Sequence, residues 1–128
     1  MITATLRHFA LTELRHPELV VNDCAVRLDD IRELCGFPLV ITSDARTAAE
    51  NASAPGSSAS SLHLLGRAFD LQWLEDAAQR WAFLEAVYLA SGSWSVELEL
   101  VPFGPNRHIH VGWFPDDGHP STLIFSEV

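Results

Sequence analysis

The chain has 128 residues, enough for one hydrophobic core and too few for two, so we expect a single domain over residues 1–128. Apolar residues make up 48% of the chain and charged residues 20%, a balance typical of a folded protein and not of a disordered one. The net charge of −9 leaves no broad basic surface, so neither nucleic acid nor an anionic membrane is an expected partner.

The N-terminal residues show no basic stretch followed by an apolar one, and no apolar run approaches about 18 residues. We therefore expect synthesis in the cytoplasm without a signal peptide, and no membrane insertion. The two cysteines, Cys24 and Cys35, fall on one predicted helix, where eleven residues span about 16 Å, too far for a disulfide. Both are predicted to be free thiols in the core.

The first third of the chain predicts an entry segment, a helix and a strand. Residues 1–21 predict an extended entry with one turn of helix. Apolar residues then recur at helical spacing from an N-cap at Asn22 or Asp23, and Gly36 follows as a C-terminal stop. The β-branched run 38–43 predicts a short buried strand.

The middle of the chain predicts a loop, a strand and a second long helix. Residues 47–60 are rich in Ala, Ser and Asn, which predicts a mobile loop at the rim of a cleft. Alternation over residues 68–73 predicts a strand with Asp70 on one face and core residues on the other. Helical spacing over residues 75–90 predicts a helix that packs across the sheet through its apolar residues, which include Trp81 and Tyr88.

The last third of the chain predicts a β-hairpin. Residues 94–100 and 108–113 both alternate, and a six-residue connection, 102–107, joins them. Turn residues then lead to a short final strand around residues 123–125.

Two pairs of polar residues share a strand face in this hairpin. Period-two geometry places His108 beside His110, and Glu97 beside Glu99 on the neighbouring strand. An unpaired charge or imidazole inside a protein is costly, so polar residues in register on an apolar hairpin need an explanation. A bound divalent metal would supply it.

Three residues meet the requirements of a catalytic zinc site. Such a site commonly takes three ligands from His, Asp or Glu and activates water at the fourth position. His63, Asp70 and His110 are the predicted ligands. Hydrolysis of an amide also needs a base and a cation that steadies the oxyanion. The candidates are His108 or Glu99 for the base, and Arg46 for the cation.

Three motifs then resemble a known family. Residues 61–70 resemble, position for position, the signature S-x-H-x-x-G-x-A-x-D of the zinc D-alanyl-D-alanine carboxypeptidases and their peptidoglycan endopeptidase relatives, many of them phage or prophage proteins. Residues 40–46 resemble the strand and turn of that family that end in arginine, usually S-G-Y-R. Residues 108–110 resemble the closing H-x-H or W-x-H segment, whose last histidine is the third zinc ligand and which recurs in the hedgehog signalling domain.

The resemblance implies an α+β fold of the hedgehog type, in which two or three helices pack a small antiparallel sheet and zinc lies in the cleft. Arg46 and Ser61 are the predicted substrate-binding residues, although Ser61 can instead form a turn or support the ligand two residues later. The sequence departs from the family's pattern in two segments. Arg107 stands where many relatives have a general-base glutamate, and Asp44-Ala45 replaces Gly-Tyr.

Two functions are therefore expected to compete. The first is a zinc metallopeptidase that cuts an amide bond in the peptide stems of bacterial peptidoglycan, acting on the cell wall after lysis or from a phage particle. The second is a non-catalytic zinc-binding interaction module of the same fold, because the usual glutamate is replaced by Arg107. The sequence does not determine which bond is cut, whether the enzyme acts as a carboxypeptidase or an endopeptidase, or which oligomeric state the protein has. Two histidines and an aspartate favour Zn²⁺ but tolerate other transition metals.

Overall fold

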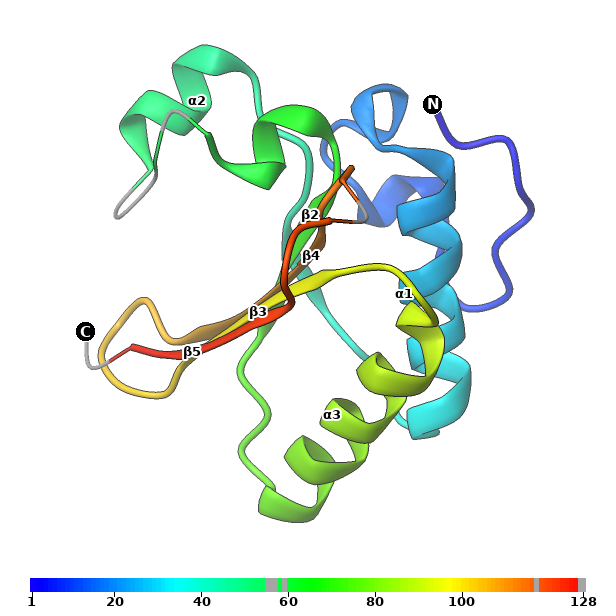
Figure 1. Ribbon diagram of the computed structural model, residues 1–128, viewed down its shortest axis with the longest axis vertical. Helices are drawn as coiled ribbons and strands as arrows, with labels where there is room; N and C mark the ends of the chain where they lie inside the picture. Colours follow the sequence, from blue (N-terminus) through cyan, green and yellow to red (C-terminus); the bar gives the residue numbers. More distant parts are fainter. Residues whose placement is uncertain (55–57, 59, 117, 127–128) are drawn as a thin grey trace.

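The computed structural model describes residues 1–54, 58, 60–116 and 118–126, and shows a five-stranded sheet with two long helices against it (Figure 1). In chain order the elements are the 3₁₀ helices η1 (Leu11–Glu13) and η2 (Pro17–Leu19), then α1 (Asn22–Cys35), β1 (Ile41–Ser43), α2 (Ala48–Ser53), η3 (Leu62–Leu65), β2 (Ala68–Gln72), α3 (Ala77–Ser91), β3 (Val96–Val101), β4 (His108–Trp113) and β5 (Thr122–Phe125). The predicted α+β fold is confirmed.

The strands lie in the order β1-β2-β4-β3-β5, and every neighbouring pair is antiparallel except β3 and β5. The sheet is therefore mixed, where an antiparallel sheet was expected. The cause is the connection after β4, which returns to the start of β3: Phe114 N–H donates to Ser95 O (3.0 Å), and Val96 N–H donates to Ser121 Oγ (3.0 Å). From that end, β5 can only run alongside β3 in the same direction.

Helices α1 and α3 pack on the same face of the sheet (Figure 1). The core between them and the strands is built from alternate residues of β2 and β4, namely Phe69, Leu71, Ile109, Val111 and Trp113, all buried. The remaining residues of these two strands point to the opposite face. This alternation separates an apolar face, covered by helices, from a polar face that carries the site.

The two long helices occupy the predicted stretches. Helix α1 ends at Gly36, whose φ of +81° is the left-handed conformation that glycine adopts readily. Helix α3 begins after Asp76, whose side chain accepts a hydrogen bond from Gln79 N–H (3.0 Å). Cys24 is buried and Cys35 half-buried, both as free thiols. Within the described ranges, no helix combines the length and the apolarity that a membrane crossing requires.

The entry segment, residues 1–21, is held by three side-chain acceptors on α1 and at the end of β1. Each accepts hydrogen bonds from two consecutive backbone N–H groups, at 2.9–3.1 Å. The pairs are Thr3 and Ala4 on Asn22, Arg7 and His8 on Asp29, and Arg15 and His16 on Asp44. Side chains of the body thus satisfy the backbone of a segment with little regular structure.

Two expectations about helices were wrong. The stretch 47–60, expected to be a loop, contains α2, because Thr47 and Glu50 form a capping box in which each side chain accepts from the other's backbone N–H. Residues 55–57 and 59 of the expected loop lie outside the described part of the chain. In α3, Trp81 and Tyr88 were expected to face the core but are 73% and 79% exposed.

Helix α3 packs instead through Phe83, Ala86 and Val87, which are buried. Apolar residues occur on most of its circumference, so their spacing predicts a helix without selecting the face that packs against the sheet.

Candidate metal centre

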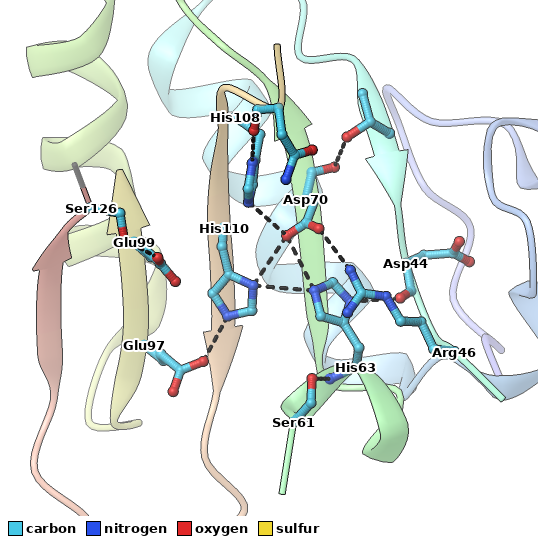
Figure 2. A network of polar contacts seen from close by, with 12 residues as sticks. Asp44, Arg46, Ser61, His63, Asp70, Glu97, Glu99, His108, His110 and Ser126 are labelled. Carbon is cyan, nitrogen blue, oxygen red and sulfur yellow. Dashed lines mark hydrogen bonds and ion pairs between the residues drawn. The ribbon is translucent and has the colours of Figure 1, made fainter. Parts of the chain in front are cut away.

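Three residues from three elements meet on the polar face of the sheet: His63 from η3, Asp70 from β2 and His110 from β4 (Figure 2). All three are buried. His63 Nε2 lies 3.1 Å from Asp70 Oδ1 and 3.2 Å from His110 Nδ1, and His110 Nδ1 lies 3.1 Å from Asp70 Oδ1. The three atoms therefore form a nearly equilateral triangle.

The size of this triangle fits a tetrahedral metal ion. Ligand atoms around a tetrahedral zinc ion lie about 3.3 Å apart when the bonds are about 2.0 Å long. Nitrogen and carboxylate oxygen are also the donor types that zinc accepts. His63, Asp70 and His110 can therefore hold a metal ion.

The outward nitrogen of each imidazole already has an acceptor. His63 Nδ1 lies 2.7 Å from the backbone oxygen of Asp44, and His110 Nε2 lies 2.7 Å from Glu97 Oε1. Because a carbonyl or carboxylate oxygen only accepts, each neutral ring donates outward and turns its lone pair toward the triangle. Outer partners of this kind fix the tautomer and orientation of metal-binding histidines.

The electrostatics of the cluster favour a cation among its three inward atoms. Burial disfavours a charged His110, but hydrogen bonds to Asp70 and Glu97 outweigh it and raise the pKa of His110 to about 9. Burial raises the pKa of Asp70, but the hydrogen bonds from His110 and His63 outweigh this effect and lower the pKa far below its usual range. A proton or a metal ion among these atoms balances the buried negative charge.

Close contacts explain why the signature has small residues at Gly66 and Ala68. Gly66 ends η3 with a φ of +68°, and a Cβ there would lie 1.9 Å from the backbone oxygen of Leu19. Its own carbonyl accepts a hydrogen bond from Val21 N–H (2.8 Å). Ala68 pairs with Gly112 across the sheet, where a Cβ on Gly112 would lie 2.9 Å from Ala68 Cβ. A Cβ on Gly112 would also lie 3.0 Å from Leu62 Cδ1, so the absence of a side chain at Gly112 lets η3, which carries His63, pack against the sheet.

Arg46 and Ser61, the predicted substrate-binding residues, both contact this cluster. Arg46 Nη2 lies 3.0 Å from Asp70 Oδ2, the carboxylate oxygen outside the triangle, and Nη1 lies 3.5 Å from Asn51 Oδ1 in α2. Ser61 is the N-cap of η3, where its hydroxyl accepts from His63 N–H (3.2 Å). In this arrangement Ser61 supports the backbone of a candidate ligand.

The two predicted bases, His108 and Glu99, have different hydrogen-bond partners. His108 Nδ1 bonds the backbone oxygen of Asn106 (2.6 Å), so its Nε2 keeps a lone pair, and this atom lies 3.9 Å from Asp70 Oδ1. Glu99 pairs with His110 in the strand register, but its carboxylate accepts from the hydroxyl of Ser126 (Figure 2). Arg107 forms an ion pair with Glu75 (2.8 Å).

The outer partners of the two histidines were not assigned from the sequence, although Glu97 was named as a polar residue on the neighbouring strand. Asp44 acts on His63 through its backbone oxygen, which leaves no side-chain signal. Glu97 and Glu99 share a strand face, and strand alternation cannot choose between them. The strand register would pair Glu99 with His110, yet the His110 ring reaches the diagonal neighbour Glu97 (Figure 2).

Comparison with known proteins agrees with this geometry. No curated protein matches the chain. The family model described as Peptidase M15 matches residues 5–112, a span that includes His63, Asp70 and His110. This match covers most of the 128 residues and confirms the family resemblance of residues 61–70. The chain belongs to the Peptidase M15 family.

Proposed function

We propose that the protein is a zinc metallopeptidase that hydrolyses an amide bond in the peptide stems of bacterial peptidoglycan. One observation carries this proposal: three electron-pair donors lie 3.1–3.2 Å apart, and both imidazoles donate their N–H outward. His63, Asp70 and His110 would hold the metal. When bound, zinc supplies a Lewis acid that polarises a carbonyl group and acidifies water.

The remaining residues of the site would move protons and bind negative charge. The Nε2 lone pair of His108 faces the cluster and can accept a proton from water during attack on the amide. Glu99, on the next strand, is the second candidate base. Arg46 stands beside Asp70, where its guanidinium can bind a substrate carboxylate or steady a developing oxyanion. Ser61 would position His63 from behind.

The family match supports a peptide substrate, and the resemblance of residues 61–70 to the cell-wall peptidases is the reason for proposing peptidoglycan. Such an enzyme would meet peptidoglycan after lysis or from a phage particle. Carboxypeptidase and endopeptidase action differ in product, because the first releases a single terminal residue and the second separates two peptides.

Purified cell wall tests the proposal directly. The wild-type protein, the same protein with chelator, and His63→Ala are compared for release of muropeptide fragments, with mass spectrometry of the products. His119→Ala is the matched control, since His119 is an exposed histidine that stacks on Phe114 outside the cluster. We expect release by the wild type and the control only. Elemental analysis should give one zinc per chain in both, and none in His63→Ala.

Two further variants separate the candidate bases. His108→Gln should abolish hydrolysis with zinc retained if His108 is the base, and Glu99→Gln should do so if Glu99 is the base. The non-catalytic zinc module is the second candidate, because Arg107 is engaged with Glu75 and brings no carboxylate to the cluster. Stoichiometric zinc without fragment release by the wild type would favour that module and overturn the peptidase.

A further inference from the structure

A cavity of about 330 Å³ opens beside the candidate metal centre, between the end of β1 and α2. Its lining is Arg15, Ser43, Ala45, Arg46, Glu50, Ser53 and Ala54. Arg46 connects the cavity to the candidate metal centre, because it lines the cavity and its Nη2 lies 3.0 Å from Asp70 Oδ2. The volume is at the lower end of those that hold small ligands, which suits about one residue of a peptide.

The lining of this cavity is positive in a strongly acidic chain. Arg15 and Arg46 are two of only eight basic residues in the whole sequence, whose net charge is −9. Among the described residues that line the cavity, Glu50 is the one acidic residue, so these residues carry a net charge of +1. Two guanidinium groups on one cavity favour an anion, and a carboxylate matches the planar fork of arginine.

Two carboxylates hold Arg15 in its position. Its backbone N–H donates to Asp44 Oδ1 (3.1 Å), and Asp44 is only 1% exposed. Its side-chain Nε lies 3.3 Å from Glu50 Oε2. Glu50 is itself held by the capping box of α2 and by His16 Nε2 (2.8 Å). The Arg15 side chain nevertheless stays 77% exposed, so its guanidinium is open to a ligand.

The same aspartate links this arginine to the metal centre. The side chain of Asp44 holds the backbone of Arg15, while its main-chain oxygen accepts from His63. The backbone of Arg15 is therefore held by the residue that also contacts a candidate metal ligand, and its guanidinium is oriented by Glu50. Preorganisation of this kind lowers the entropic cost of ordering a binding residue.

We propose that this cavity is a subsite for a free carboxylate of the peptide substrate next to the scissile bond, with Arg15 as its specificity-determining residue. The proposal rests on the proposed function for the identity of that substrate. The carboxylate can come from the C-terminus of a peptide or from an acidic side chain.

Three peptides distinguish these sources: N-acetyl-D-alanyl-D-alanine, its C-terminal amide, and N-acetyl-D-alanyl-D-glutamic acid α-amide, in which the side-chain carboxylate is the only free carboxyl group. Binding to the zinc-loaded protein is measured by NMR titration, and KM and kcat are measured wherever cleavage occurs. The variants are Arg15→Gln and Arg15→Lys. Arg32→Gln, on α1, is the matched control.

The wild type should bind a carboxylate peptide about tenfold more tightly than the amide, because a charge-assisted hydrogen bond is worth at least that factor. Arg15→Gln should remove most of this preference through KM, with kcat and affinity for the amide unchanged. Arg15→Lys should be intermediate, and Arg32→Gln should match the wild type.

Equal affinity of the wild type for all three peptides would overturn the subsite, as would equal weakening of all three by Arg15→Gln. A carboxylate preference that depends on Arg15, without cleavage of any peptide or of cell wall, would support the subsite and contradict the peptidase. The experiment can therefore contradict the carboxylate subsite and the peptidase function independently of each other.

Discussion

Strands β2 and β4 present two different faces to the molecule. Phe69, Leu71 and Ile109 point to the face covered by α1 and α3 and are buried among apolar side chains. Asp70 and His110, their immediate neighbours in sequence, point to the polar face and form the candidate metal centre. The two faces are built from alternate residues of the same two strands, β2 and β4.

The difference shows how an apolar core positions polar chemistry. A one-residue slip of β2 against β4 would bring Asp70 into the core and expose Phe69, at a high cost in burial. The helix-covered face therefore holds the register in which Asp70 pairs with His110. Stability is concentrated on one face and metal chemistry on the other, and variants on each face should separate the two properties.

The largest expected effect on stability comes from the helix-covered face. Ile109 is fully buried, so Ile109→Ala should lower the free energy of unfolding by about 2–5 kcal/mol through lost burial and a cavity. The folded fraction should still bind one zinc per chain, because the neighbouring ligands keep their register. Urea unfolding and zinc titration at low temperature measure both. Leu123→Ala, at an exposed position of β5, is the control and should change stability by less than about 0.5 kcal/mol.

Of the two faces, the polar one carries His110, a group whose proton should make stability depend on pH. In metal-free protein the pKa of folded His110 is about 9, above its ordinary value of 6.5. Its proton therefore contributes stability, up to about 3 kcal/mol, that is fully present below pH 6.5 and is lost as the pH rises through about 9. Urea unfolding in chelator between pH 6 and pH 10 should show this loss.

Two variants and one addition check the origin of that pH dependence. His110→Gln should remove the pH dependence of stability, whereas Ile109→Ala should keep this pH dependence and have a lower free energy of unfolding at every pH. Saturating zinc should also remove the loss at high pH, because the metal replaces the proton among the three inward atoms. A wild-type stability that stays constant over this range in chelator would contradict the assignment.

Two glycines test the junction between the entry segment and the metal centre. Gly36 and Gly66 both have positive φ, but a Cβ on Gly36 meets nothing within 4 Å, whereas on Gly66 it would lie 1.9 Å from Leu19 O. Gly36→Ala should cost about 1–2 kcal/mol of stability from backbone strain alone. Gly66→Ala should cost more than about 2 kcal/mol and should also weaken zinc binding, because η3 carries His63. Equal effects of the two variants on zinc affinity would rule out this coupling.

Much of the architecture could be predicted because it depends on local patterns. Apolar spacing predicts α1, α3 and the hairpin of β3 and β4, and the signature 61–70 predicts two of the three candidate ligands. The parallel pairing of β5 depends on where its connection returns, which no local pattern encodes. Helix α2 did have a local signal, the Thr-x-x-Glu of its capping box, within a stretch whose composition is typical of loops.

The outer contacts of the metal centre could not be predicted, because they depend on side-chain direction across strands. Glu97 and Glu99 are equivalent in sequence, and only the structure assigns His110 to Glu97. The hydrogen bond from His110 lowers the pKa of Glu97, which therefore stays ionised beside the ring. This pair gives the smallest and most specific test of the contrast between the two faces.

Glu97→Gln keeps an acceptor for His110 Nε2 but removes the charge, so it should weaken zinc binding about tenfold. Glu97→Ala removes the acceptor as well and should weaken zinc binding closer to about a hundredfold. Competition with a chromophoric chelator measures both affinities. Glu99→Gln is the matched control, because Glu99 bonds Ser126 and should leave zinc affinity unchanged. If Glu99→Gln weakens zinc binding as much as Glu97→Gln, the negative charge of the strand face acts at a distance, and the oriented hydrogen bond to His110 is not what tunes the metal centre.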